Sequence, residues 1–170
     1  MKRVKRVLAL LAAFALVLAM AVPAWAEGNK GNITVQNAKE NEEYKIYRIF
    51  DLESYSENSY SYKMSEKWSK AGFATNSVFK EYFEIVNGYI KPKAEFTDEA
   101  AATFAKNALA FAKEKKIEDD GHQTAGKTGV SFSNLSLGYY LLDTSLGTLC
   151  SLDTTNPAAI LREKNDSPTI

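Results

Sequence analysis

Three residues carry the side chains that acyl transfer requires: His122, Cys150 and Arg162. In such chemistry a cysteine thiolate attacks a carbonyl carbon, a histidine moves the proton and an arginine steadies the negative oxygen. His122 lies in the polar segment Asp119–Gln123, and Cys150 lies in a segment typical of a strand. We therefore expect His122 to be solvated and Cys150 to fill the core.

The chain order His, Cys, Arg resembles that of a sortase, a cysteine transpeptidase. Sortases carry their nucleophile in a Thr-Leu-x-Thr-Cys strand, whereas Thr148-Leu149-Cys150 lacks the two intervening positions. Metal chemistry is no better supported, because one histidine and one cysteine supply too few ligands for zinc. The acidic run Glu118-Asp119-Asp120 lacks the alternating oxygen ligands of a calcium loop. The sequence thus predicts no enzymatic activity, no metal and no cofactor.

Residues 1–26 have the pattern of a secretory signal peptide. Four basic residues precede the uncharged apolar run Val7–Val22, and Ala24 and Ala26 place small side chains where signal peptidase cleaves. An uncleaved anchor needs about 20 apolar residues, but this run is shorter and Pro23 ends it. We expect cleavage after Ala26, a mature chain beginning at Glu27, and secretion.

The mature chain, residues 27–170, has the length of a single domain. It keeps 17 of the 21 basic residues and all 21 acidic ones, a formal net charge of −4. That mild charge gives no reason to expect nucleic acid as a partner, and the membrane is needed only before cleavage. With one cysteine, the chain has no internal disulfide to stabilise it.

The mature chain is predicted to be mainly β with one inserted helix. Thr97 is a suitable cap for a helix over Asp98–Lys116, whose apolar stripe includes Phe104 and Phe111. Asn87-Gly88 supplies the positive φ angles of a tight hairpin, a helical turn surrounds Trp68, and Glu118–Thr128 is a polar loop. Short strands are predicted at 32–36, 44–50, 60–64, 83–86, 89–91, 130–135, 139–144, 148–152 and 159–164. These elements favour a β-sandwich with a helix on one side.

Several segments resemble the first domain of backbone pilins from Firmicutes: Gly31–Val35 leading to Tyr44–Asp51, Gly138–Thr144, and Thr148–Pro157 running into Arg162–Asn165. The Gly138–Thr144 segment is similar to the penultimate strand of collagen-binding-protein B-type modules. The resemblance implies an immunoglobulin-like sandwich and a structural role in a sortase-assembled fimbria on a Gram-positive cell surface. Its implied partners are other pilin subunits and a sortase.

B-type modules often carry an isopeptide bond between a lysine of the first strand and an asparagine of the last, promoted by a buried acid. By resemblance Asn165 has the asparagine position and Asp143 the position of the acid, but Gln36 stands where the lysine belongs. The set therefore looks incomplete. The chain also ends without the family's Leu-Pro-x-Thr-Gly sorting signal. That leaves open a fragment of a longer pilin or a protein secreted without wall attachment.

A secreted adhesin domain is the alternative function. Tyrosines provide large amphipathic contact surfaces in protein interfaces, and this chain has a group of them between residues 44 and 62: Tyr44, Tyr47, Tyr55, Tyr60 and Tyr62. Such a surface would bind host matrix proteins or glycans. Strand alternation instead turns some of these side chains into the core, and the sequence does not separate the two.

Overall fold

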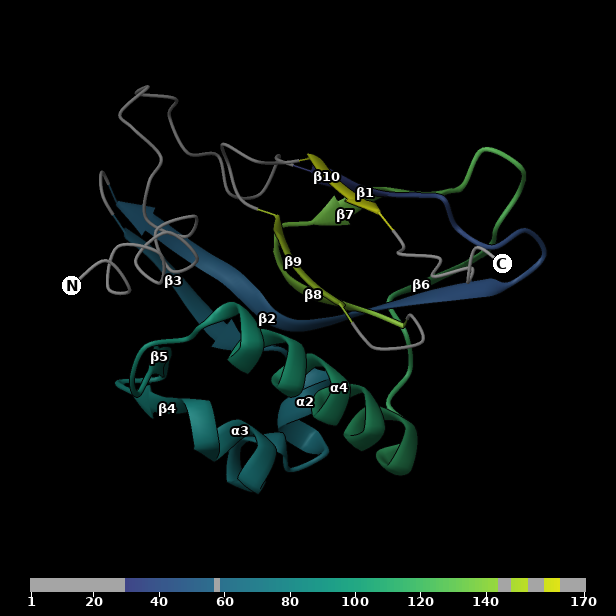
Figure 1. Cartoon of the computed structure of the whole chain (residues 1–170). Coiled ribbons are helices and arrows are strands. Elements are labelled where there is room, and N and C mark those ends of the chain that lie inside the picture. The colour runs from purple at the N-terminus through teal and green to yellow at the C-terminus, as the bar shows by residue number, and fades with distance from the viewer. Residues whose placement is uncertain (1–29, 57–58, 144–147, 153–157, 163–170) are drawn as a thin grey trace.

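The computed structural model describes residues 30–56, 59–143, 148–152 and 158–162. The fold is mainly β and is arranged in three layers (Figure 1). A three-stranded sheet, here sheet A, faces one side of a five-stranded sheet, here sheet B. The helices pack on the other side of sheet B, together with a two-stranded hairpin.

Sheet A joins the first and the last described strands to a strand from the second half of the chain. Its order is β10-β1-β7, with bounds Ala158–Arg162, Lys30–Gln36 and Val130–Ser136. β1 is the central strand, parallel to β10 and antiparallel to β7. Its residues alternate between exposed and buried, because one face of the sheet packs on the core and the other faces solvent.

Sheet B is built around one long strand. Its order is β3-β2-β8-β9, with β6 paired to the start of β2. The strands span Ser59–Met64 (β3), Glu43–Ser56 (β2), Gly138–Leu142 (β8), Thr148–Leu152 (β9) and Gly121–Thr124 (β6). The predicted polar loop over Glu118–Thr128 is therefore wrong in its middle, where β6 hydrogen-bonds to Glu43–Ile46. β6 escaped prediction because three of its four residues are exposed and polar, without alternation.

The helical layer is larger than the single inserted helix expected from the sequence. α4, over Asp98–Lys115, agrees with the prediction, and Thr97 caps it by accepting a hydrogen bond from the Ala100 amide. The helical turn at Trp68 is also confirmed as α2. The layer further holds η1 and α3, so the expectation of one helix is wrong. The remaining elements span Glu66–Lys70 (α2), Phe73–Thr75 (η1), Ser77–Tyr82 (α3), Phe83–Val86 (β4) and Tyr89–Pro92 (β5).

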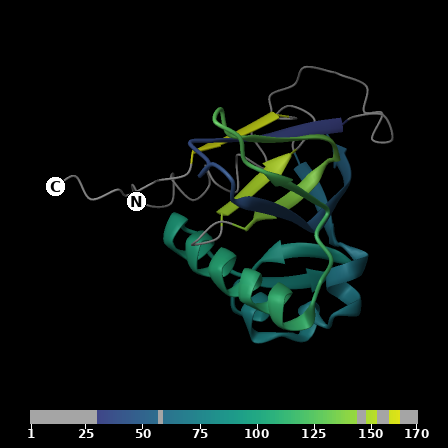
Figure 2. The ribbon, with the colours of Figure 1, turned by 90° about the vertical axis from the view of Figure 1, so that its right-hand side faces the viewer.

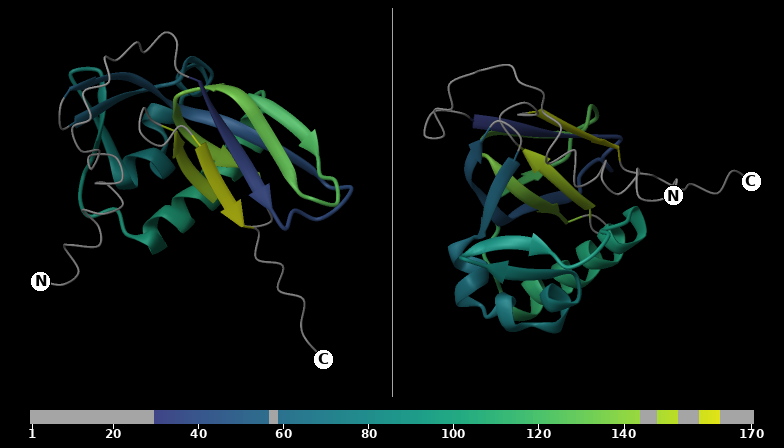
Figure 3. Two further views of the ribbon diagram at one scale, coloured as in Figure 1. Left: turned by 90° about the horizontal axis from the view of Figure 1, so that it is seen from above. Right: turned by 90° about the vertical axis from the view of Figure 1, so that its left-hand side faces the viewer.

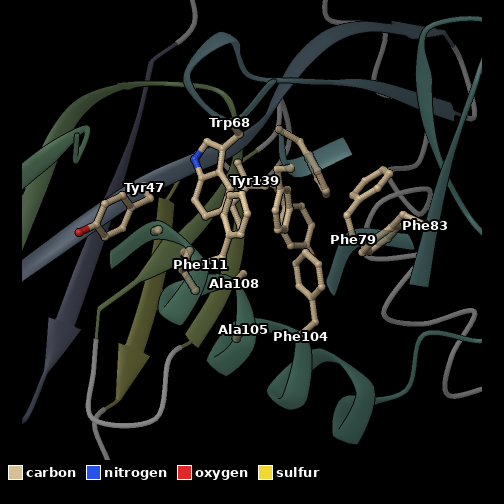
Figure 4. Close-up of a cluster of buried hydrophobic side chains, with 14 of the residues drawn as sticks. Tyr47, Trp68, Phe79, Phe83, Phe104, Ala105, Ala108, Phe111 and Tyr139 are labelled. Atoms are coloured by element: carbon tan, nitrogen blue, oxygen red, sulfur yellow. The ribbon is translucent and has the colours of Figure 1, made fainter. Parts of the chain in front are cut away.

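Sheet B separates two apolar cores. One lies between the sheets and includes Ile33 and Val35 of β1. The other lies between sheet B and the helices and is mostly aromatic. Figure 2 shows the helical layer on the side of sheet B away from sheet A. Figure 4 shows Phe104 and Phe111 of α4 pointing into the aromatic core, with Phe111 beside Trp68. Because both faces of sheet B are covered, β2 has apolar residues on both of its faces.

Candidate functional site

The first and last described strands lie side by side and run in the same direction. β1 pairs with β10 from Asn32 opposite Ala158 to Gln36 opposite Arg162, without a break in register. Figure 3 shows the two strands as neighbours pointing the same way. The N-terminal end of β1 and the C-terminal end of β10 therefore lie at opposite ends of the pair.

β1 is held from its other edge and from its inner face as well. It pairs antiparallel with β7, and Ile33 and Val35 are 0% and 1% exposed between the two sheets. Gly129 has a φ of 107°, and a Cβ there would lie 2.3 Å from the Val35 carbonyl oxygen. Only glycine fits at position 129, so the chain that enters β7 runs in close contact with Val35 of β1.

The positions assigned by resemblance to an isopeptide bond are only partly described. Gln36 is half-buried at the end of β1, while Asn165 lies outside the described residues. Asp143 follows β8 in sheet B, and its amide donates to the Lys45 carbonyl at 2.8 Å. Its Oδ1 lies 3.2 Å from Nζ of Lys113 on α4. The incomplete cross-link remains a prediction.

The predicted signal peptide, with its cleavage residues Ala24, Ala26 and Glu27, also lies outside the described residues. Within the described ranges, none of the helices has the length and apolar character needed to cross a membrane.

A polar cluster that the sequence did not reveal lies at a bulge in β2, where the pairing with β8 shifts register between Arg48 and Phe50. The Arg48 amide donates to Asp120 Oδ2 at 2.6 Å, and the Arg48 carbonyl accepts from Ser65 Oγ at 2.7 Å. Asp120 Oδ1 also lies 3.1 Å from Nζ of Lys67 on α2. The carboxylate of Asp120 thus accepts a hydrogen bond from the backbone amide at the bulge, and its ion pair with Lys67 connects sheet B to the helical layer.

The side chain of Arg48 extends the cluster between the sheets. Its Nε lies 2.7 Å from Asp51 Oδ1. Burial nevertheless raises the pKa of Asp51, an effect that the charge of Arg48 offsets only in part. Burial also raises the pKa of Tyr140 to about 12, and its hydroxyl donates to the Ser136 carbonyl at 2.6 Å. The contact of Arg48 with Asp51 is an ion pair rather than a hydrogen bond, since neither of the two atoms has a hydrogen-bond partner. Because Asp120, Ser65 and Tyr140 bond to the backbone, we interpret the cluster as structural.

The structure does not bring His122, Cys150 and Arg162 into one site. β6 carries His122 and β9 carries the Cys150 backbone, with β2 and β8 between them. Three strand spacings separate these two strands, about 14 Å. Arg162 ends β10 in sheet A. His122 is exposed, and its Nδ1 lies 3.1 Å from Asp119 Oδ1.

Backbone carbonyls of the acidic run Glu118-Asp119-Asp120 also accept hydrogen bonds that join parts of the fold. Nζ of Lys67 donates to the carbonyls of Glu118 and Asp119 at 3.3 and 3.2 Å. No group of three or more candidate metal ligands occurs among the described side chains.

Most of the tyrosines considered for a contact surface serve the core. Tyr44, Tyr47 and Tyr62 are 2%, 5% and 7% exposed, and Tyr60 is half-buried against the aromatic core. The side chain of Tyr55 lies outside the described part. Both faces of sheet B are covered, so tyrosines on either face of β2, such as Tyr44 and Tyr47, are buried.

No family model matches the chain, and no curated protein matches it.

Proposed function

We propose that this chain is a structural subunit that carries tension in a sortase-assembled fimbria on a Gram-positive cell surface, built as a B-type immunoglobulin-like sandwich. The resemblance of the Gly31–Val35, Tyr44–Asp51 and Gly138–Thr144 segments to backbone pilins motivates the proposal. The mainly β fold with two facing sheets is consistent with it. The observation that carries it is the parallel pairing of β1 with β10.

Parallel terminal strands are the geometry that resists stretching. In a fibre, tension pulls the N-terminal end of β1 and the C-terminal end of β10 apart. Since these ends lie at opposite ends of the pair, the pull is directed along the strands, and all the hydrogen bonds between them are strained together. Antiparallel neighbours would have both ends on one side and would open one bond at a time. Each bond contributes only about 1 kcal/mol net, so simultaneous loading raises the barrier to forced unfolding.

Single-molecule force spectroscopy tests the mechanical half of the proposal. Tethers at the two termini should give a high unfolding force. The matched control keeps the N-terminal tether and moves the second tether to Ala158, which is exposed at the start of β10. Both tethers then lie at one end of the pair, so β1 and β10 should peel apart at a clearly lower force. Equal forces in the two geometries would contradict the proposed role.

Assembly is tested in the cell wall. Antibody against the chain should detect a ladder of high-mass species that survives boiling in detergent, and deletion of the sortase should collapse the ladder. A single band of monomer mass found only in the culture medium would rule out assembly into a covalent fibre.

A further inference from the structure

β10 differs from the other edge strands of the two sheets. β3 lies against β5, where Nζ of Lys63 is 5.3 Å from the centre of the Tyr89 ring. β9 packs against α4, and β6 and β7 lie against each other. The pairing of β7 with β1 is also interrupted by a register shift, close to Asn134 at φ 58°. Coverage and bulges of this kind stop an edge strand from pairing with another chain.

β10 makes a smaller contact of this kind, with β9, and its pairing contains no bulge. Its pairing with β1 is unbroken, and no described strand pairs with its outer side. Residues 158–161 contain no charge and no proline. Ile160, in the middle of the strand, is 65% exposed and is the most exposed large apolar side chain among the described residues. An extended edge strand with few charges presents a row of backbone donors and acceptors, and the partner that satisfies such a row is another strand.

We propose that β10 pairs antiparallel with β10 of a second copy of this chain, joining two copies of sheet A into one continuous sheet. A two-fold axis at Ile160 sets this residue opposite its own copy. The same register sets Ala158 opposite Arg162, so the only charged residue of the strand does not meet its like. Two-fold pairing of identical strands is self-complementary, and setting the two exposed Ile160 side chains beside each other removes apolar surface from water.

The dimer is expected to be weak and reversible, because five residue pairs bury less surface than a standard interface. It is independent of the tension borne by β1 and β10, since it uses the opposite edge of β10. In a fibre it would act laterally, between neighbouring strands of subunits.

Sedimentation velocity of the full mature chain over a wide concentration range tests the proposal. The wild type should show a dimer whose fraction rises with concentration. Ile160→Lys places like charges opposite each other at the two-fold axis and should raise the dissociation constant about tenfold or more. The matched control is Asn32→Lys, an exposed position on β1, one strand inward and paired with Ala158. It should leave the dissociation constant unchanged.

Circular dichroism and thermal melting keep the comparison interpretable, because both substituted side chains are exposed and both variants should melt like the wild type. A chain that remains monomeric at every concentration overturns the proposal. So does a dimer weakened equally by both variants, which would indicate association through the face of sheet A. A dimer that neither variant affects overturns it too. None of these outcomes changes the result expected from force spectroscopy or from the cell-wall ladder, so a failure of this proposal is distinguishable from a failure of the proposed function.

Discussion

The carboxylate of Asp120 should contribute to the free energy of unfolding through its contacts at the bulge in β2. Asp120→Ala removes the acceptor of the Arg48 amide at the bulge and the partner of Lys67. An unsatisfied buried amide costs about 1–3 kcal/mol, so the midpoint of urea unfolding should fall accordingly. The control is Glu118→Ala, an exposed side chain nearby, which should stay within about 0.5 kcal/mol of the wild type. Equal effects would show that Asp120 does not hold the bulge.

Tyr140 makes stability depend on pH in the alkaline range. Its pKa is 10.0 when unperturbed and about 12 in the folded chain, chiefly because burial disfavours the phenolate. Between these values the folded state binds more protons than the unfolded state, so the free energy of unfolding falls as pH rises from 10 towards 12. Tyr140→Phe should flatten this slope in urea unfolding measured at several pH values. Identical slopes for the two proteins would contradict the shift.

At the scale of elements, α4 should behave as part of the core. Phe104 is 0% exposed in the aromatic core, so Phe104→Asp buries a charge without a partner and should destabilise the fold by about 3 kcal/mol or more. Lys106→Ala, on the exposed side of the same helix, should change stability by less than about 0.5 kcal/mol. Chemical denaturation measures both. Small and equal effects would remove α4 from the core.

The elements show which signals a sequence carries. α4 was predictable because its cap, its end charges and its apolar stripe agree over eighteen residues. The Asn87-Gly88 hairpin was predictable from one dipeptide, and both residues have positive φ. α3 was not, since six residues are too few to display a helical period. The polar cluster was hidden as well, because Arg48, Ser65 and Asp120 are distant in sequence and meet only at a bulge.

For the whole molecule, the order of layers could not be read from patterns. The alternation of β1 indicates one buried face, but β2 packs on both faces, and which core each residue enters depends on the bulge at Arg48. The pairing of β1 with β10 was implied only by resemblance. It is a contact between the two ends of the domain, and local propensity carries no information on such contacts.

The last prediction is that the mature domain folds without an internal isopeptide bond. Bond formation needs a neutral amine beside an asparagine and a protonated acid. The end of β1 offers Gln36, and the one lysine of that strand, Lys30, lies at its other end with Nζ 3.3 Å from Ser136 Oγ. Lys45, on β2, is paired with Glu43 at 3.4 Å, and Asp143 is paired with Lys113.

Resistance to tension would then rest on non-covalent contacts, chiefly the hydrogen bonds of β1 with β10, and unfolding should be reversible. The intact mass of the purified mature chain should equal that calculated for residues 27–170. A mass lower by one ammonia, mapped by digestion to a lysine and Asn165, would show that a covalent bond supplements the strand pair. In that case the unfolding force with terminal tethers would not measure the hydrogen bonds, because the bond would keep β1 and β10 together under load.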